Sequence, residues 1–575
     1  MAKFTFKSDT QELRTWLNKR KSSLEQRRLP FESLWKDIRE YYEPTLGKGL
    51  LEGSVDEVAA KRDDEKILNT TPRLLLHRMG AGLQSGITNQ SRRWFNFAAL
   101  DNDLTEYSAV RQWLDSTAEA VSSAMNRSNV YPALDQTYLH LGQFGTAAGI
   151  IYPDDENTVH LRMIDCGNYW LGDDKRGRVT SVLERISMTL DQVVEEFGKG
   201  WTPDRIIERI KNGKGDERVT VWHLVQKHTR PDLIKDIAKD RLFASVYWLD
   251  GDASQDKNNG IIAIRSFSYN PIIAPRWATN GTVYGIGCGQ LGLGDTKQLQ
   301  QLEADKLRLV EQEIDPAMAA PASMKDWPLQ TGAGGITYYP DMQGKGGVPI
   351  TRMFETRAQI QPLLEAINAT EQRLRQTFYA DLFALMINLN MQPKQMTARE
   401  VNELSSEKVA LLGPILTRLN TDLLNPLVDA VFAIAIEQGL VEEAPPILQG
   451  QELKVEYVSS LHVEQAAASR LTGLYKIAEF TGSLAQIAPS AVDKLDVDQM
   501  VDVAATSLVE FGVVRDDKKV AALRQARHEQ EVQMAQAQAQ AQQAKQMASA
   551  AKDLSQTPVG QGGTALDAIL TGGRA

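Results

Sequence analysis

The stretch that decides the fold covers residues 284–314 and reads YGIGCGQLGLGDTKQLQQLEADKLRLVEQEI. A glycine-rich segment leads into a helix, and Asp295 followed by Gln298 is the capping-box pattern of a helix N-terminus. Because the residue before a proline disfavours helical backbone, we expect the helix to end at Asp315, before Pro316. One stripe of this helix is apolar, consisting of Leu299, Leu302, Leu309 and Ile314.

A second long helix returns after a segment rich in glycine and aromatic residues. Within residues 317–356, the run GITYYPD fits one strand of a small sheet. The return helix covers residues 362–386, and Pro362 suits its first turn. It places Leu363, Ile367, Leu374, Phe378, Leu382 and Leu385 on one side. One subunit cannot bury both helices of such a hairpin, which predicts copies packed side by side around an axis.

Composition and charge narrow the class of protein. A chain of 575 residues is long enough for several modules, and its 42% hydrophobic content is ordinary for a folded protein. The net charge of −10 argues against a general basic coat for nucleic acid, although a protein that surrounds DNA without gripping it remains compatible. Cys166 and Cys288 are the only cysteines and form neither a disulfide framework nor a metal-binding pattern, so we expect a reducing compartment.

No segment has the features of a targeting or membrane sequence. The N-terminal MAKFTFKSDT lacks the apolar core of a secretory signal. The most apolar stretch, residues 423–440, carries Asp429 and Glu437 and is interpreted as a buried helix, since a bilayer requires about 20 apolar residues. We therefore expect a soluble, cytosolic protein that does not bind membranes.

The first 288 residues predict a mixed α+β body within a predominantly α-helical chain. Residues 9–45 have helical spacing, and residues 105–150 give two further helices. From Gly149 the pattern changes to alternating runs such as TVHLRMI and RVTSVLERI, with turns expected at Gly172-Asp173 and Gly177. More strands are expected at residues 219–225, 244–249 and 261–269.

The second half is mostly helical. After a polar loop at residues 388–395, a helix begins at Thr397, is bent by Pro414 and Pro426, and runs to Gly439. Its buried side is expected to consist of Leu411, Ile415, Leu419, Leu423, Leu427 and Val431. Further helices are expected within residues 463–511. Residues 525–552 consist mainly of Ala, Gln, Glu, Lys and Met. They form either an ordered helix or a frayed end, and order would require neighbouring copies because Ala buries little apolar area.

No motif supports catalysis. Residues 287–292, GCGQLG, match GxGxxG, but the buried strand before them and the acid that ends a second strand are both missing. A flexible entry to the helix is the better interpretation. There is no Walker A sequence, Ser85 is one place away from a nucleophile elbow, and His528-Glu529 lacks the second histidine of a zincin. We predict no enzyme activity, no cofactor and no metal site.

Several segments, in order, carry a resemblance to a known family. They are LWKDIREYYEPTLGKG (residues 34–49), TTPRLLLHRMGAGLQSGITNQSRRWF (70–95), VYPALDQTYLHLGQFGTAAGII (130–151), RGRVTSVLERISMTLDQVVEEFG (176–198), YNPIIAPRWATNGTVYGIG (269–287) and MTAREVNELSSEKVALLGPIL (396–416). This ordered set resembles the portal, or head-to-tail connector, proteins of short-tailed bacteriophages. It covers roughly residues 30–440, and the C-terminal part matches less well.

The resemblance implies a dodecameric ring with a central channel at one capsid vertex of the virion, assembled after synthesis in the host cytoplasm. The implied domains are a wing (1–288), a first stem helix (289–316), a clip (317–356), a second stem helix (357–387), a tunnel loop (388–396), a long wing helix (397–445), and a crown with a possible helical barrel (446–575). Implied partners are double-stranded DNA, bound without sequence specificity, the terminase large subunit, a tail adaptor, and the major capsid and scaffolding proteins.

Site residues follow from these assignments. The tunnel-loop candidates for DNA contact are Asn388, Asn390, Gln392, Lys394 and Gln395, because one cation among neutral amides can touch phosphates without holding them. The channel-lining stem candidates are Glu303, Lys306, Glu311 and Glu313, and the partner-binding clip candidates are Trp327, Tyr338 and Tyr339. Alternatively, Lys394 is an ordinary surface charge at a helix start, and the stem charges form a solvated face with intrahelical pairs.

Two other classes stay open on the sequence alone. GCGQLG would make the chain a nucleotide-binding enzyme if it bound a cofactor. The long helices would also suit another large structural oligomer of the virion, such as a scaffold or a filament.

Overall fold

The structure is a computed structural model, and it describes residues 6–51, 64–101, 107–238, 240–251, 256–314, 318–319, 351–352, 360–383, 412–451, 453–458, 477, 481, 517–556, 558–559 and 563–564. The chain divides into two compact units, Met1–Gln465 and Ala466–Ala575. Each unit is considered by itself.

Unit 1 begins with four long helices. They are α1 (Thr10–Tyr41), α3 (Thr71–Ile87), α4 (Ser108–Arg127) and α5 (Val130–Phe144). The helices predicted within residues 9–45 and 105–150 are confirmed, and α1 begins with Asp9 capping the backbone N–H groups of Gln11 and Glu12.

Helix α3 was not predicted, because its glycines weaken the apolar periodicity. Those glycines serve close helix packing: a Cβ at Gly82 would lie 2.4 Å from a ring carbon of Phe383, and one at Gly80 would lie 3.0 Å from a methyl of Leu139. The helix therefore depends on neighbours that are remote in sequence.

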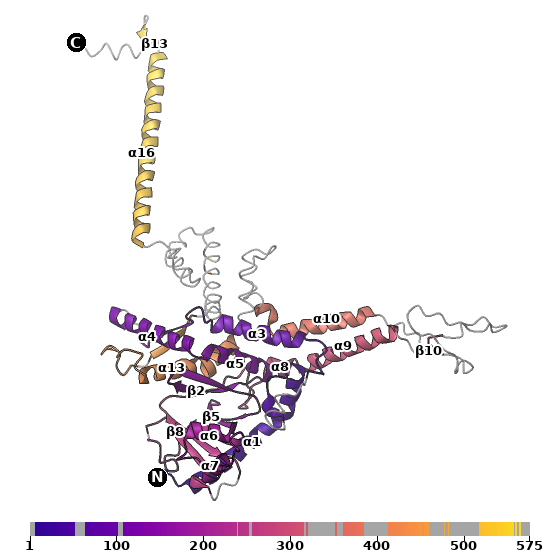
Figure 1. Cartoon of the computed structure of the whole chain (residues 1–575). Helices are drawn as coiled ribbons and strands as arrows, with labels where there is room; N and C mark the ends of the chain where they lie inside the picture. The colour runs from indigo at the N-terminus through magenta and orange to yellow at the C-terminus, as the bar shows by residue number, and fades with distance from the viewer. Residues whose placement is uncertain are drawn as a thin grey trace, which may run out of the picture. The chain divides into compact units, whose positions relative to one another are not determined.

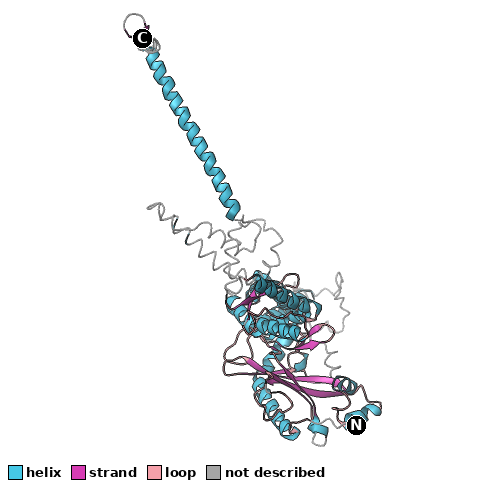
Figure 2. Ribbon diagram, turned by 90° about the vertical axis from the view of Figure 1, so that its left-hand side faces the viewer, coloured by secondary structure: helices cyan, strands magenta, loops and turns pink. Residues whose placement is uncertain are grey.

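Two antiparallel sheets form the β part of unit 1. The larger sheet has the order β4-β5-β6-β7-β8, and the smaller one the order β3-β2-β9. Figure 2 shows the long strands with helices on more than one side of them. The bounds are β2 (Ala148–Asp154), β3 (Thr158–Ile164), β4 (Tyr169–Asp173), β5 (Val179–Thr189), β6 (Arg218–Lys227), β7 (Phe243–Leu249), β8 (Ile261–Phe267) and β9 (Ile272–Ile273). Two short helices, α6 (Leu190–Phe197) and α7 (Asp204–Lys211), follow β5.

The strands predicted within residues 149–269 are confirmed, with one correction at a turn. Gly172 and Asp173 do not form a turn: they belong to β4, where the pairing with β5 shifts register. The turn lies after them, with Gly177 at φ 74°. A separate pair joins β1 (Phe95–Ala99) to β12 (Leu453–Tyr457), so residues 453–457 pair with a strand of the first hundred residues.

The predicted helical hairpin is present as α9 (Leu293–Ile314) and α10 (Ile360–Thr377), preceded by the short α8 (Cys288–Leu291). Figure 1 shows α9 and α10 running side by side away from the rest of unit 1. The described part of α9 runs to Ile314, and Asp315, where the helix is predicted to end, lies outside the described residues. The prediction that Asp295 caps α9 was wrong, because the helix begins two residues earlier and the Asp295 carboxylate pairs with Arg373 instead, at 2.8 Å.

The return helix was predicted as one piece to residue 386, and this was also wrong. It stops at Thr377, turns at Phe378 and Tyr379, and becomes helical again over residues 380–383. Tyr379 has φ 52°, a left-handed conformation that is unusual for a residue other than glycine. Contacts described below hold this residue in place.

The helix Leu412–Glu437 packs in the core. Leu419, Leu423, Leu427 and Val431 are fully buried, as predicted. It contains a π-helical turn, η5 (Asn420–Leu424), followed by α13 (Asn425–Glu437), and this departure lies directly before Pro426. The helix is long and apolar enough to cross a membrane, but half of its most apolar window is buried in the protein. The interpretation as a buried helix therefore holds.

The remaining described elements are few. Between α9 and α10, β10 (Met318–Ala319) pairs with β11 (Thr351–Arg352). In the second unit, α16 (Asp517–Gln556) is one continuous helix, followed by the short pair of β13 (Pro558–Val559) and β14 (Gly563–Thr564). The predicted strand GITYYPD, the loop at 388–395 and the helix start at Thr397 lie outside the described residues.

Candidate functional site

The glycine-rich segment before α9 packs against the end of α5. Gly145 caps α5 at φ 77°, and a Cβ there would lie 2.3 Å from the backbone nitrogen of Gly287. A Cβ on Gly289 would lie 2.3 Å from the carbonyl oxygen of Gln143. The glycines of GCGQLG thus allow two backbones to touch. The segment is a fixed root for α9 rather than a flexible entry, and the faces that would approach a pyrophosphate are occupied by α5.

The hairpin is held together at its root. Leu299 of α9 and Leu374 of α10 are fully buried, and Arg373 joins Asp295 at 2.8 Å and Gln298 at 3.1 Å. Beneath them, the Tyr42 ring lies 5.6 Å from that of Phe378, and the Tyr42 hydroxyl accepts a hydrogen bond from Thr296 at 2.8 Å. The end of α1 thereby contacts α9 and the residue that directly follows α10.

A polar clamp fixes the segment before α3 to the same hairpin. The side-chain oxygen of Gln300 accepts hydrogen bonds from the backbone N–H groups of Leu68 and Asn69, both at 2.8 Å. The Asn69 amide donates to Glu303 of α9 at 3.1 Å and to Glu371 of α10 at 3.0 Å. Asn69 therefore joins both helices. Gln300 is only 5% exposed, so its hydrogen bonds are shielded from solvent.

The four charged stem candidates divide into two environments. Glu303 and Lys306 form an ion pair on the inner part of α9, where Glu303 is mostly buried. Glu311 and Glu313 lie exposed on the outer part. Apolar side chains are exposed beside them on the same outer part of α9, with Leu307 at 55%, Val310 at 38% and Ile314 at 78%. Nothing among the described residues covers these side chains.

A buried carboxylate stabilises the junction below the hairpin. Glu43 accepts two hydrogen bonds from Arg73, at 2.6 and 2.8 Å, and contacts His77 at 3.0 Å and Thr45 at 2.7 Å. Burial by itself raises the pKa of the Glu43 carboxyl, but the hydrogen bonds from His77, Thr45 and Arg73 outweigh burial, and the net pKa lies below the ordinary value.

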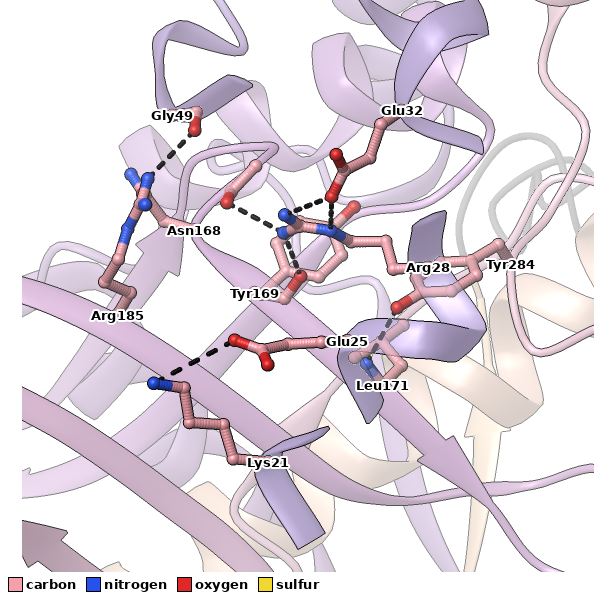
Figure 3. Close-up of polar contacts among 11 residues, drawn as sticks. Lys21, Glu25, Arg28, Glu32, Gly49, Asn168, Tyr169, Leu171, Arg185 and Tyr284 are labelled. Carbon is pink, nitrogen blue, oxygen red and sulfur yellow. Dashed lines mark hydrogen bonds and ion pairs between the residues drawn. The ribbon is translucent and has the colours of Figure 1, made fainter. Parts of the chain in front are cut away.

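Helix α1 is joined to the larger sheet by a second polar network (Figure 3). Arg28 donates to the carbonyl oxygens of Gly167 at 2.7 Å and Tyr169 at 3.0 Å, pairs with Glu32 at 2.7 Å, and stacks over Trp170 at 3.9 Å. The network reaches the root of α9, because the backbone N–H of Leu171 donates to the Tyr284 hydroxyl at 3.1 Å.

Sequence reasoning missed Asn69, Gln300, Glu43 and Arg28. None of them belongs to a motif. Apart from Thr45, Glu32 and Thr71, their hydrogen-bond partners lie between 30 and 302 residues away, so no local pattern marks them. The remaining predicted site residues lie outside the described part of the chain: Asn388, Asn390, Gln392, Lys394, Gln395, Trp327, Tyr338 and Tyr339. Among the residues that the structure describes, no group of His, Cys, Asp or Glu could hold a metal ion. Both cysteines are buried and free.

Comparison with known proteins identifies the family. Residues 14–509 match the family described as "Bacteriophage head to tail connecting protein". The chain is 34% identical over 551 residues to the portal protein of Salmonella phage epsilon15, covering 94% of this chain and 95% of that protein. It is 31% identical over 504 residues to the probable portal protein of Bordetella phage BPP-1, covering 87% of this chain and 88% of that protein.

Among solved structures, the chain is similar to one from the neck of an empty GTA particle, with a TM-score of 0.31 and 10% identity over 79% of this chain and 88% of that one. We draw no inference from a score this low. The sequence relationships span nearly the whole chain, and the described fold is a mixed α+β one with mostly helices. The chain therefore belongs to the family of bacteriophage head-to-tail connecting proteins, the portal proteins, which are structural and non-enzymatic components at the portal vertex of the virion.

Proposed function

We propose that copies of this chain form a closed ring through which the genomic DNA enters and leaves the capsid. The observation that carries the proposal is the hairpin of α9 and α10, which leaves Leu307, Val310 and Ile314 uncovered at its outer end. A row of exposed apolar side chains on one helix is typical of a surface that another molecule covers. A closed ring supplies such a cover, because each subunit presents one face to the next.

In this proposal α9 and α10 line the channel as the stem, and unit 1 below their root forms the wing. Residues 317–356 form the clip, where Trp327, Tyr338 and Tyr339 would contact the terminase large subunit and then a tail adaptor. Residues 388–396 form the tunnel loop, where Lys394 and its amide neighbours would touch DNA. The capsid and scaffolding proteins would surround the wing, and residues after 446 would form the crown.

The charge pattern supports passage of DNA rather than its retention on the wall. Glu311 and Glu313 are exposed near the outer end of α9, and the whole chain carries a net charge of −10. Phosphate contacts by Lys and Arg determine how strongly a protein holds DNA, so an acidic wall binds it weakly. The ring would act passively, guiding DNA that the ATP-hydrolysing terminase moves.

The proposal is tested by negative-stain electron microscopy of the purified protein with two-dimensional averaging. We expect closed rings with a central hole, and their rotational symmetry gives the number of subunits. Open filaments would contradict the proposal and favour another structural oligomer. If only monomers are seen, the same measurement is repeated after co-expression with the phage scaffolding protein, and a sample that still lacks rings would also contradict it.

A further inference from the structure

A pocket in unit 1 lies where the two sheets meet α6 and the end of α13. Its volume is about 500 Å³, within the usual range of ligand pockets. No residue of α9 or α10 lines it, so it is separate from the hairpin. Its wall combines aromatic rings with three arginines and three acids, namely Arg162, Arg241, Arg265, Asp154, Glu196 and Glu437.

Arg162 of β3 is held in place by a buried polar network that lies behind the pocket wall. Its guanidinium pairs at 2.7 Å with Glu184, which is 3% exposed and does not line the pocket. The other carboxylate oxygen of Glu184 lies 3.3 Å from Nδ1 of His223, and Nε2 of His223 lies 2.9 Å from the Ser245 hydroxyl. These three partners are buried on the adjacent strands β5, β6 and β7. Buried polar groups are stable only when paired, and this pairing fixes the position of one guanidinium at the wall.

Arg265 of β8 is oriented by different groups. Its guanidinium lies 5.7 Å from the ring of Phe197 and 5.6 Å from that of Tyr247, and it pairs with Glu196 at 3.0 Å. The Tyr247 ring in turn stacks on His223, with 3.8 Å between the ring centroids. The network behind Arg162 therefore also supports Arg265, and the pocket has two guanidiniums in fixed orientations.

The hydroxyl of Tyr269 is a polar group at the pocket that lacks a partner. Tyr269 lines the pocket and is only 7% exposed. Its buried hydroxyl oxygen has no hydrogen-bond partner among the residues that the structure describes. Buried polar atoms are rarely left without a partner, and a ligand in the pocket would supply the missing one.

The unused hydrogen-bonding capacity of the wall consists mainly of donors. Glu437 accepts a hydrogen bond from Ser268 at 2.6 Å and pairs with Arg241 at 3.7 Å. Asp154 accepts the backbone N–H of Asn157 at 3.1 Å. Each acid at the wall thus has a donor, whereas a guanidinium carries five N–H groups and uses only some of them in these pairs. The pocket therefore suits a ligand that accepts hydrogen bonds.

We propose that this pocket binds a carboxylate group carried on an aromatic or apolar body. A carboxylate accepts paired hydrogen bonds from a guanidinium and has further lone pairs for the Tyr269 hydroxyl. A doubly charged phosphate fits less well, because three acids at the wall balance the three arginines. The body of the ligand packs on the rings of Tyr152 and Phe267, which also line the pocket. The carboxylate belongs either to a free small molecule or to the end of a protein chain.

The ligand class is tested by isothermal titration calorimetry of the full chain with N-acetylphenylalanine, which joins a carboxylate to a ring. We expect a dissociation constant of about 1 mM or lower. The uncharged N-acetylphenylalaninamide has the same size and should bind at least about tenfold more weakly. Absence of binding by the acid, or equal binding of acid and amide, would show that the proposal is wrong. Tighter binding of phenyl phosphate or of phenethylamine would overturn it as well, in favour of a dianion or a cation.

Two variants place the bound acid in this pocket. Tyr269→Phe should lower the affinity about tenfold and leave the free energy of unfolding without ligand unchanged, because the hydroxyl has no partner to lose. Arg265→Gln should lower the affinity by about tenfold or more. Arg230→Gln is the matched control, since Arg230 is 44% exposed against 45% for Arg265, also pairs with a carboxylate, and does not line the pocket.

The affinity of the control should equal that of the wild type. If Tyr269→Phe and Arg265→Gln also bind the acid like the wild type, the acid binds elsewhere and the pocket assignment is wrong. A loss of stability in Tyr269→Phe would contradict the proposal too, because the hydroxyl would then have a partner within the protein.

A four-residue peptide that ends in phenylalanine with a free carboxylate distinguishes the two sources of the ligand. Tighter binding of the peptide than of N-acetylphenylalanine assigns the pocket to the end of a protein chain, and equal binding assigns it to a free small molecule. Failure of every probe would leave the proposed ring untouched, because the pocket lies within one subunit and away from α9 and α10.

Discussion

At the scale of single residues, Gly145 shows how much a fold can depend on the absence of a side chain. Gly145→Ala would place a methyl group 2.3 Å from the nitrogen of Gly287 and 2.6 Å from the carbonyl oxygen of Gly285, in addition to the cost of φ 77°. We expect a loss of roughly 3 kcal/mol or more in the free energy of unfolding, because backbone atoms on both sides must move. Denaturant unfolding of the purified protein measures it.

Gly213→Ala is the matched control for this variant. Gly213 has nearly the same φ, 78°, but no atom lies within 4 Å of the position of its Cβ. Gly213→Ala should lower the free energy of unfolding by only about 1 kcal/mol, the penalty of the left-handed conformation. Equal losses in the two variants would show that the contact between α5 and the root of α9 is not tight.

Glu43 gives a prediction for the dependence of stability on pH. Its folded-state pKa lies below the ordinary glutamate value, so the stability it contributes is complete above the unfolded-state pKa and is lost as the pH falls through the folded-state pKa. Glu43→Gln should cost about 3 kcal/mol at pH 7, since it leaves Arg73 without its buried partner. The difference between wild type and variant should shrink as the pH falls below about 4.3.

Thermal unfolding of both proteins between neutral and acid pH checks this prediction. Asp115→Asn is a suitable control, because the Arg93–Asp115 pair lies at the surface with Asp115 68% exposed, and such pairs contribute roughly 0–1 kcal/mol. A Glu43 difference that stays constant down to acid pH would mean that the carboxylate charge is not what stabilises the junction.

At the scale of elements, α16 shows the limit of what an intrinsic preference explains. Its residues favour helix, and the described side chains of its second half are exposed. We expect deletion of residues 525–575 to leave ring formation intact, because in the proposed ring the contacts between subunits come from the proposed stem and wing. Negative-stain images of the truncated protein give the result, and a loss of rings would show that this helix drives assembly.

The return helix shows the opposite case, in which tertiary contacts overrule a preference. The run after Pro362 has helical spacing as far as residue 386, yet α10 stops at Thr377. Phe378 packs on Tyr42, Tyr379 on Trp277 and Phe383 on Gly82. An unbroken helix would turn these side chains in other directions, so the three contacts together account for the turn.

At the scale of the whole molecule, the exposed outer end of α9 allows the folding of one subunit to be measured separately from the assembly of several. Ile314 is 78% exposed, so Ile314→Glu should change the stability of the subunit by less than about 0.5 kcal/mol. The same change should reduce ring formation, because it places a charge where a neighbour is proposed to pack. Gln312→Glu adds the same charge at an exposed position two residues away and should assemble normally.

Analytical ultracentrifugation of the three proteins at equal concentration compares their assembly. Rings in Ile314→Glu at the wild-type level would show that the outer end of α9 is not a subunit interface. An unfolded Ile314→Glu subunit would instead show that this side chain belongs to the core of a single chain.

The sequence by itself determined the elements whose signal is local. Apolar residues at helical spacing predicted α1, α9 and the buried face of Leu412–Glu437, and alternation predicted β3 and β5 to β8. It also weighed against nucleotide binding without excluding it, since GCGQLG lacks its context, and its ordered segments carried the family resemblance that the comparisons confirmed.

Only the tertiary structure decided which residues hold these elements together. Arg28, Glu43, Asn69 and Arg276 act through partners far away in the chain, and no local pattern distinguishes them from surface residues. The glycines before α9 looked like a flexible entry, yet they are the places where two backbones touch. The physical reason is that periodicity reports which face of an element is buried, whereas kinks, close approaches and buried ion pairs depend on what lies against that face.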